Sequence, residues 1–250
     1  MEQIERTAML LGSGGVARLG KARVAVFGLG GVGGHAAEAL VRSGVGAIDL
    51  IDRDRVALSN LNRQLIATRE TVGRLKTEVM AERLLAINPE IRITLWPMFY
   101  LPETADKIDL RRYDYVLDAV DTVTAKLTLV QRAAEADTPI ISAMGAGNKL
   151  DPTLLQVADI GDTAMDPLAR IMRKELRRRG IERLKVVFST EPAMEPDAAE
   201  RTDGGEPGRR STPGSVAFVP SVMGLIMAGE VVRDIALNRL NRPLRAEEDV

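Results

Sequence analysis

The chain has 250 residues, 45% of them hydrophobic, which is enough to bury the core of one α/β domain. Its 34 basic and 35 acidic side chains give a formal net charge of −1, so any nucleic-acid site must be a local patch. The sequence contains no cysteine, which excludes disulfides, thiolate zinc sites, thioester intermediates and persulfide relays.

Neither segment that might direct the chain to a membrane has the required pattern. The polar stretch Met1 to Arg6 lacks the apolar core of a signal peptide. The longest apolar stretch, Val216 to Val232, contains Pro220, Gly224 and Glu230 and is only about 17 residues long, at the lower limit for crossing a bilayer. A buried helix is therefore favoured, and we expect a cytoplasmic protein with no membrane partner.

Strands and helices are predicted to alternate along the first part of the chain. A β-branched run ending in glycine (23–28) predicts a buried strand, and the alanine-rich stretch after it (35–42) predicts a helix. The same patterns then predict strand 48–51, helix 72–87, strand 91–96, strand 113–117, helix 124–136 and strand 139–143. This alternation predicts an α/β fold, a Rossmann-like parallel sheet with helices on both faces.

Beyond residue 150 the pattern changes. It predicts strand 153–158, a basic helix 167–179, strand 185–188 and a closing helix 219–240. Residues 195–214 are rich in proline, glycine and charge, so we expect a mobile loop there. We interpret residues 1–250 as a single domain, with a nucleotide-binding part at about 20–160 and a C-terminal substrate part at about 161–250.

Glycines between the first predicted strand and helix indicate a nucleotide site: Gly28, Gly30, Gly31 and Gly33. Glycine lets the backbone approach a phosphate closely, and the helix N-terminus beyond adds free N–H groups. Asp52 ends the second strand, where a carboxylate accepts hydrogen bonds from ribose hydroxyls. The loop alone leaves the nucleotide open. It favours an NAD(P)-linked oxidoreductase, and glycines needed only for tight packing are the remaining alternative.

Three charged residues further along the chain favour a triphosphate. Arg63 can fork onto phosphate oxygens, and Lys76 can place a point charge on the same phosphates. Asp121 follows a parallel strand at the edge where such sheets bind ligands, and it can hold Mg²⁺ through water. Hydride transfer needs none of these groups, whereas attack at a phosphorus atom needs charge neutralisation. The sequence therefore predicts ATP and Mg²⁺.

The combined motifs resemble the ubiquitin-activating-enzyme-like superfamily, which has a ThiF/MoeB-type adenylating fold. The resemblance runs over residues 6–159 and rests on these motifs: Gly-x-Gly-Gly-x-Gly, Asp52-x-Asp54, Asn60-x-Asn62-Arg63-Gln64, Gly73-x-x-Lys76 and Asp118-x-x-Asp121. Bacterial members adenylate sulfur-carrier proteins or small carboxylates.

The resemblance implies a role for each matching residue. Arg63, Lys76 and Asp121 would be catalytic, with Asp121 as the Mg²⁺ residue. The other residues around the nucleotide would be Gly31, Asp52, Asp54, Asn60, Asn62, Gln64 and Thr122. Arg6 resembles the arginine that members reach across a dimer interface, so a homodimer is implied.

One branch of the superfamily fits best. Sulfur-carrier adenylators usually carry two Cys-x-x-Cys pairs for zinc, and this chain has no cysteine. The segments that resemble tRNA threonylcarbamoyladenosine dehydratases are 39–46, 79–83, 145–159, 166–169 and 187–191. That resemblance implies adenylation, by ATP, of the threonylcarbamoyl carboxylate on a tRNA adenosine, followed by cyclisation. Adenylation of a ubiquitin-like sulfur carrier, with a possible sulfur-transfer partner protein, is the alternative, and an NAD-linked oxidoreductase is a weaker one.

Basic residues gather on the predicted helix 167–179. The candidate tRNA contacts are Arg173, Lys174, Arg177, Arg178 and Arg179. Clustered cations on one helix match the charge pattern that binds a phosphate backbone, although most charged runs are solvated helix faces. Two other polar residues stay open. His35, the only histidine, is interpreted as a surface or packing residue, and Lys126 either reaches the nucleotide or faces solvent.

Overall fold

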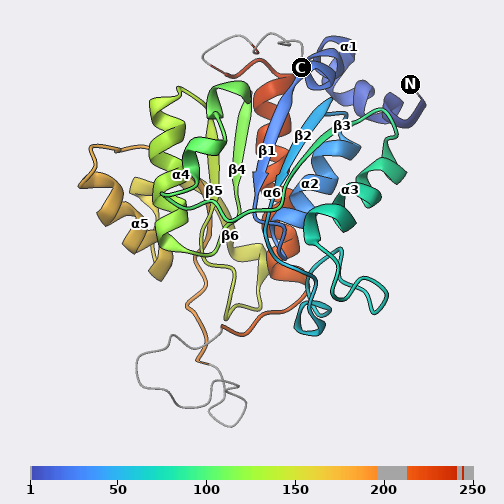
Figure 1. Cartoon of the computed structure of the whole chain (residues 1–250). Coiled ribbons are helices and arrows are strands. Elements are labelled where there is room, and N and C mark those ends of the chain that lie inside the picture. Colours follow the sequence, from blue (N-terminus) through green and yellow to red (C-terminus); the bar gives the residue numbers. More distant parts are fainter. Residues whose placement is uncertain (1, 196–212, 241–243, 245–250) are drawn as a thin grey trace.

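A seven-stranded sheet forms the centre of the protein, in a computed structural model that describes residues 2–195, 213–240 and 244. The strand order is β3-β2-β1-β4-β5-β7-β6 (Figure 1). The strands are β1 (Arg23–Phe27), β2 (Ala47–Ile51), β3 (Arg92–Trp96), β4 (Tyr115–Asp118), β5 (Ile140–Ala143), β6 (Leu155–Asp159) and β7 (Lys185–Ser189). The predicted strands and the α/β class are thus confirmed.

The sheet is mostly parallel, as predicted, and the edge strand β6 runs antiparallel to β7. Two parallel strands start at the same end of the sheet, so a parallel neighbour requires a crossover that carries the chain back to that end. Residues 144–154 contain only the short 3₁₀ turn Pro152–Leu154. The chain therefore enters β6 at the end of the sheet where β5 finishes, and β6 runs in the opposite direction.

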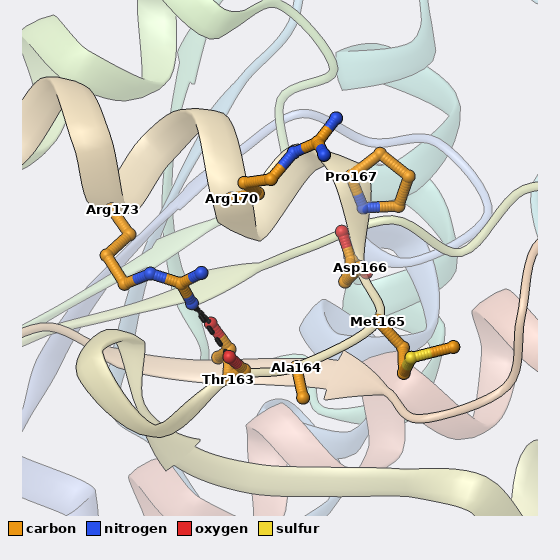
Figure 2. Close-up of a pocket in the computed structure, with 7 residues that line it drawn as sticks. All are labelled: Thr163, Ala164, Met165, Asp166, Pro167, Arg170 and Arg173. Carbon is orange, nitrogen blue, oxygen red and sulfur yellow. Dashed lines mark hydrogen bonds between the residues drawn. The ribbon is translucent and has the colours of Figure 1, made fainter.

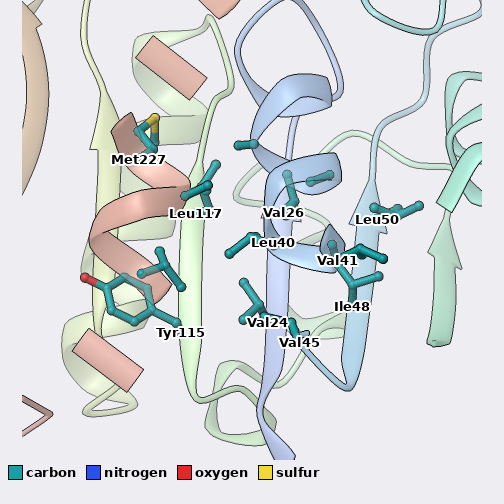
Figure 3. Packing of buried hydrophobic residues seen from close by; sticks show 14 of the residues in the cluster. Val24, Val26, Leu40, Val41, Val45, Ile48, Leu50, Tyr115, Leu117 and Met227 are labelled. Carbon is teal, nitrogen blue, oxygen red and sulfur yellow. The ribbon is translucent and has the colours of Figure 1, made fainter. Parts of the chain in front are cut away.

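Helices cover both faces of the sheet, as predicted (Figure 1). They are α1 (Glu5–Lys21), α2 (Gly33–Arg42), α3 (Lys76–Ile87), α4 (Val123–Glu135), α5 (Pro167–Arg177) and α6 (Phe218–Ala236). Alternate strand residues explain the two layers. Val24 and Val26 of β1 pack in the cluster that holds α2 and α6 (Figure 3). Ala25 and Phe27 pack in the cluster that holds α4.

Helix α6 is a core element, which confirms the interpretation of the apolar stretch as a buried helix. Met223, Met227 and Val231 are fully buried against the rest of the core. A Cβ added to Gly224 would overlap the Val32 carbonyl oxygen, so only glycine lets α6 lie this close to the start of α2. Among the helices that the structure describes, none has the length and apolarity to cross a membrane.

Helix α1 was not predicted. Its sequence is interrupted by glycines, and the helix is kinked at Gly12, where φ is 72°. Contacts of its carboxyl-terminal half hold it in place: Leu19 is buried, and the Arg18 guanidinium donates to the carbonyls of Ile235 and Ala236. Arg18 thereby adds side-chain hydrogen bonds to carbonyls at the end of α6, where cations are favourable.

The predicted helix 72–87 begins instead at Lys76, so its first four residues were assigned wrongly. Gly73 has φ +88°, which is a left-handed conformation that ends regular structure. The chain there pairs with the preceding segment, because the Gly73 N–H donates to the Val56 carbonyl and the Val56 N–H donates to the Arg74 carbonyl. This turn places Lys76 at the first position of α3.

Two predictions about organisation are not settled by the fold. The predicted mobile loop 195–214 falls almost wholly on 196–212, outside the described residues. The two parts of the predicted single domain share one sheet, since β7 pairs with β5. The boundary at about residue 160 stays a prediction.

Candidate functional site

The glycine loop lies where the strand order reverses, between β1 and β4. Parallel sheets bind ligands at this point, beyond the carboxyl ends of the strands. Gly28 has φ +88°, and a Cβ on it would lie 2.6 Å from the Ala119 carbonyl oxygen, which follows β4. A Cβ on Gly33 would overlap the Gly28 carbonyl oxygen. The loop is therefore closed onto itself, and α2 begins directly at the crevice.

Residues 60–65 lie beside this loop. A Cβ on Gly31 would lie 3.4 Å from the Arg63 carbonyl oxygen, and one on Gly30 would lie 3.9 Å from the Gln64 amide nitrogen. Gln64 is only 8% exposed, and its Oε1 atom has no hydrogen-bond partner among the described residues. A buried acceptor without a partner is costly, so Gln64 fits a site that a ligand completes.

The predicted residues Asn60, Asn62 and Arg63 form a hydrogen-bonded turn. The Asn60 side chain accepts from the Ala57 N–H at 3.1 Å, which is a structural contact. The Arg63 guanidinium donates to the Asn62 side chain and to the Ser59 carbonyl, both at 2.9 Å. In the part of the chain that the structure describes, Arg63 has no carboxylate partner, so its charge is available to a phosphate.

Asp52, Asp54 and Lys76 form the second cluster of the site. The Lys76 ammonium lies 2.9 Å from Asp54 and 3.9 Å from Asp52, and Lys76 is only 5% exposed. The Asp52 carboxylate also accepts from the Leu29 N–H at 2.7 Å and from the Asp54 N–H at 2.8 Å. Burial raises the pKa of Asp52, and the Lys76 charge and these two N–H groups oppose the rise. The sheet thus holds a buried cation and a carboxylate next to the glycine loop.

Asp121 and Thr122 follow β4 at the same edge, and both are exposed. Thr122 occupies the N-cap position of α4, and its side chain makes no cap hydrogen bond. No group of three or more acidic or histidine side chains able to hold a metal exists among the described residues. A metal here would rely on phosphate and water oxygens and on one carboxylate, a mode that suits Mg²⁺.

Two open residues are placed by the structure. Lys126 does not face solvent, so that alternative was wrong: it is 1% exposed and lies 3.0 Å from Asp118. The reason is that α4 packs this face onto the ends of β4 and β5. Contact of Lys126 with the nucleotide stays a prediction. The half-buried His35 ring nitrogen Nδ1 is hydrogen-bonded to the Gly31 carbonyl at 2.8 Å, which ties α2 to the glycine loop.

Arg6 lies far from the glycine loop of its own chain. A Cβ on Gly44, which precedes β2, would lie 3.7 Å from the Ile4 side chain, so the start of α1 is at the edge where the strands begin. Figure 1 shows α1 at the opposite end of the sheet from the loop after β2. Arg6 is exposed there.

The five predicted tRNA contacts have different surroundings, and two of them lie just beyond α5, which ends at Arg177 and not at the predicted 179. Arg178 and Arg179 are paired with Glu175 at 2.7 and 3.0 Å. The Arg173 guanidinium turns inward and donates to the Thr163 carbonyl at 2.7 Å, at the wall of a pocket of about 210 Å³ (Figure 2). Lys174 and Arg177 are exposed and make no ion pair with any described residue, and the same holds for Arg170, which also lines that pocket.

The start of α5 is fixed to the edge that carries the glycine loop. Asp166 caps the helix, because its carboxylate accepts from the Ala169 N–H at 3.0 Å. The same carboxylate accepts from the Gly145 N–H at 3.0 Å and lies 3.3 Å from the Lys149 ammonium. Both residues belong to the loop that follows β5, so α5 begins beside the ligand-binding edge of the sheet.

Known proteins resemble this chain in sequence and in architecture. The model of the ThiF family matches residues 4–246. The tRNA threonylcarbamoyladenosine dehydratase of Bacillus subtilis (strain 168) is 44% identical over 241 residues, which cover 94% of this chain and 95% of that protein. The crystal structure of the E. coli tRNA N6-threonylcarbamoyladenosine dehydratase TcdA in complex with ATP has a TM-score of 0.85 and 34% identity, over 97% of both chains. The sulfur carrier protein adenylyltransferase of Thermus thermophilus is 38% identical over 131 residues, 52% of this chain and 48% of that protein. The chain therefore belongs to the ThiF family.

Proposed function

We propose that this protein uses ATP to cyclise the threonylcarbamoyl group on a tRNA adenosine. A carboxylate oxygen of the group attacks the α-phosphorus of ATP, which forms an acyl-adenylate and releases pyrophosphate. An internal carbamoyl atom then attacks the activated carbonyl carbon, displaces AMP and closes the ring, with net loss of water. The observation that carries the proposal is the pair of cations, Arg63 and Lys76, beside a glycine loop at the switch point of the sheet. The identity to dehydratases along nearly the whole chain supports the acceptor.

In this proposal some residues of the site bind the nucleotide and others neutralise the charge on its phosphates. The glycine loop and the N-terminus of α2 cradle the phosphates with backbone N–H groups. The Asp52 carboxylate is placed to accept from ribose hydroxyls, and the unpaired Gln64 oxygen can accept from a bound ligand. Arg63 and Lys76 stabilise negative charge that grows on the phosphates in the transition state, where preorganised charges act most strongly.

We infer that Mg²⁺ takes part, held through water by the exposed Asp121 carboxylate. Bound Mg²⁺ supplies further neutralisation of the phosphate charge. An exchange assay in which Asp121→Ala keeps full activity at limiting Mg²⁺ would contradict this role.

We infer a homodimer in which Arg6 serves the partner's site. Arg6 lies at the wrong edge to reach its own glycine loop, and its neighbours Met9 and Leu10 are 81% and 87% exposed. Two apolar side chains at this exposure on one helix are suited to cover by a second copy. Sedimentation equilibrium that finds only monomer at assay concentrations would overturn the inference.

A cytoplasmic location follows from the proposed tRNA substrate, and cell fractionation tests it. A sulfur-transfer partner protein is a weaker inference, supported by the sulfur-carrier adenylyltransferase among the relatives. A pull-down from a lysate that recovers no sulfurtransferase would leave it without support.

The acceptor is tested by two measurements. ATP–pyrophosphate exchange by the purified protein with Mg²⁺ reports adenylate formation, and it should appear with modified tRNA as acceptor. In a deletion strain, mass spectrometry of tRNA nucleosides should show loss of the cyclic derivative and accumulation of threonylcarbamoyladenosine. Exchange with an unchanged nucleoside profile would favour a carrier protein as the acceptor. Binding of NADH without competition by ATP would favour an oxidoreductase.

The tRNA surface is tested by comparing variants of the cations on α5 that have no acidic partner among the described residues with variants of the cations that pair with Glu175. Arg170, Lys174 and Arg177 are spaced to lie along one face of the helix and have no acidic partner among the described residues. Replacing all three with alanine should weaken tRNA binding by about tenfold or more and reduce the salt dependence of binding, since fewer counterions are released. The control is Arg178→Ala with Arg179→Ala, because both guanidinium groups share the Glu175 carboxylate and their charge is partly offset. Equal effects in filter binding would argue against this surface.

A further inference from the structure

A buried ion pair lies beneath the loop that carries Asp121. The ammonium of Lys126, the fourth residue of α4, lies 3.0 Å from Asp118 at the end of β4 and 3.3 Å from the Ser142 hydroxyl in β5. Asp118 and Ser142 are partners in the register of the two strands, and both are fully buried. The Ser142 hydroxyl also donates to the Asp118 carboxylate. Burying a charged pair carries a desolvation cost that can exceed the attraction between the charges, and apolar residues often fill such positions at least as stably. Stability alone therefore does not explain the pair.

Asp118 and Lys126 flank the loop 119–122 and bond to its two ends, Asp118 through its carboxylate and Lys126 through its backbone N–H. The second oxygen of the Asp118 carboxylate accepts from the Val120 N–H at 3.2 Å. At the other end, the Lys126 N–H donates to the Thr122 carbonyl at 3.1 Å. The loop is also pressed against Gly28, where a Cβ would lie 2.6 Å from the Ala119 carbonyl oxygen.

Asp121 lies between these anchors and is itself exposed, with no ion pair to any residue that the structure describes. Its position is thus set by the backbone on either side, not by contacts of its own side chain. If the cation beneath the loop is lost, the Asp118 carboxylate is left buried and uncompensated, and it must turn or take up water. Either change releases the Val120 N–H and loosens the loop.

We propose that Lys126 is a positioning residue: through Asp118 and the Val120 N–H it fixes the loop that presents the Asp121 carboxylate to the metal-bound phosphates. The inference rests on the proposed function of Asp121. It assigns to Asp118, the first residue of the Asp-x-x-Asp motif, and to Ser142 the task of holding the lysine.

The test uses the full-length protein and measures the loop before activity. In Lys126→Met, hydrogen exchange of the 119–122 amides in the nucleotide-free protein should be at least tenfold faster. The Mg²⁺ concentration that gives half-maximal pyrophosphate exchange should rise about tenfold, while KM for ATP at saturating Mg²⁺ changes little. If Lys126→Met does not fold, Lys126→Gln takes its place: its amide can donate to Asp118 but leaves the carboxylate without a countercharge, and the same direction of change is expected.

The matched control is Lys149→Met. Lys149 is another buried lysine, 3% exposed and 3.3 Å from the buried Asp166, but it lies outside this loop. It should leave loop exchange and the Mg²⁺ requirement as in the wild type. Wild-type loop exchange and Mg²⁺ dependence in a folded Lys126 variant would overturn the inference. If Asp121→Ala itself leaves the Mg²⁺ requirement unchanged, the proposed role of Asp121 fails instead.

Discussion

Replacing Lys76 with alanine is expected to lower kcat/KM for adenylate formation on the order of 10²-fold or more, the loss typical of a preorganised charge contact. The ammonium is held at the first position of α3 and is almost completely buried, so no water has to reorganise when it meets the phosphates. Its present partners, Asp54 and Asp52, keep it aimed at the crevice before ATP arrives. The measurement is single-turnover formation of acyl-adenylate at saturating ATP, together with ATP affinity.

A nearby cation provides the control for Lys76. Arg74 is two residues earlier, but its guanidinium pairs with Glu82 on the outer face of α3. Arg74→Ala should leave adenylate formation within about twofold, since an exposed pair of this kind contributes little. A loss below about threefold in Lys76→Ala, or an equal loss in Arg74→Ala, would remove Lys76 from the catalytic residues.

Gly33→Ala should abolish measurable ATP binding, whereas Gly34→Ala should not. A Cβ on Gly33 would overlap the Gly28 carbonyl oxygen. The position of each atom is fixed by the backbone, so no side-chain rotation relieves the clash. Either the loop or the first turn of α2 must shift, and we expect a loss of about 1–3 kcal/mol in the free energy of unfolding, as for other overpacked sites.

The neighbouring glycine is a control of the same chemistry. A Cβ on Gly34 would meet nothing closer than 3.8 Å, which is ordinary contact. Because Gly34 lies in a helix, alanine there should raise stability by up to about 1 kcal/mol. Calorimetric titration with ATP and thermal unfolding of both variants decide the matter. Equal nucleotide affinity in the two proteins would show that the loop does not cradle phosphate.

Local sequence patterns predicted the parts of the fold that depend on local order. Buried strands such as 23–28 and the glycine turn after them are visible in residue type and spacing alone. The start of α3 was missed because Gly73 and Arg74 pair with a segment 17 or more residues earlier. The direction of β6 depends on the connection from β5, and α1 is held by α6 at the far end of the chain.

The candidate site was predicted as a set of residues but not as an arrangement. Arg63, Lys76 and Asp121 follow from the chemistry of phosphate, whereas the burial of Lys126 depends on how α4 packs onto the sheet. The same holds for the basic residues on and just after α5, because composition does not reveal which of them pair with Glu175. From the sequence alone, Lys126 could not be distinguished from a lysine that faces solvent.

The close approach of α6 to α2 has a consequence for how the protein is made. Pro220 and Gly224 lie against Gly31 and Val32 of the phosphate cradle, yet α6 is the last described helix to leave the ribosome. A nascent chain that ends before Phe218 carries every glycine of the loop but lacks the helix that supports it. We expect such a chain to have little affinity for ATP, so nucleotide capture should begin only when synthesis is nearly complete. Titration of a stalled nascent chain with a fluorescent ATP analogue would detect earlier binding if it occurs.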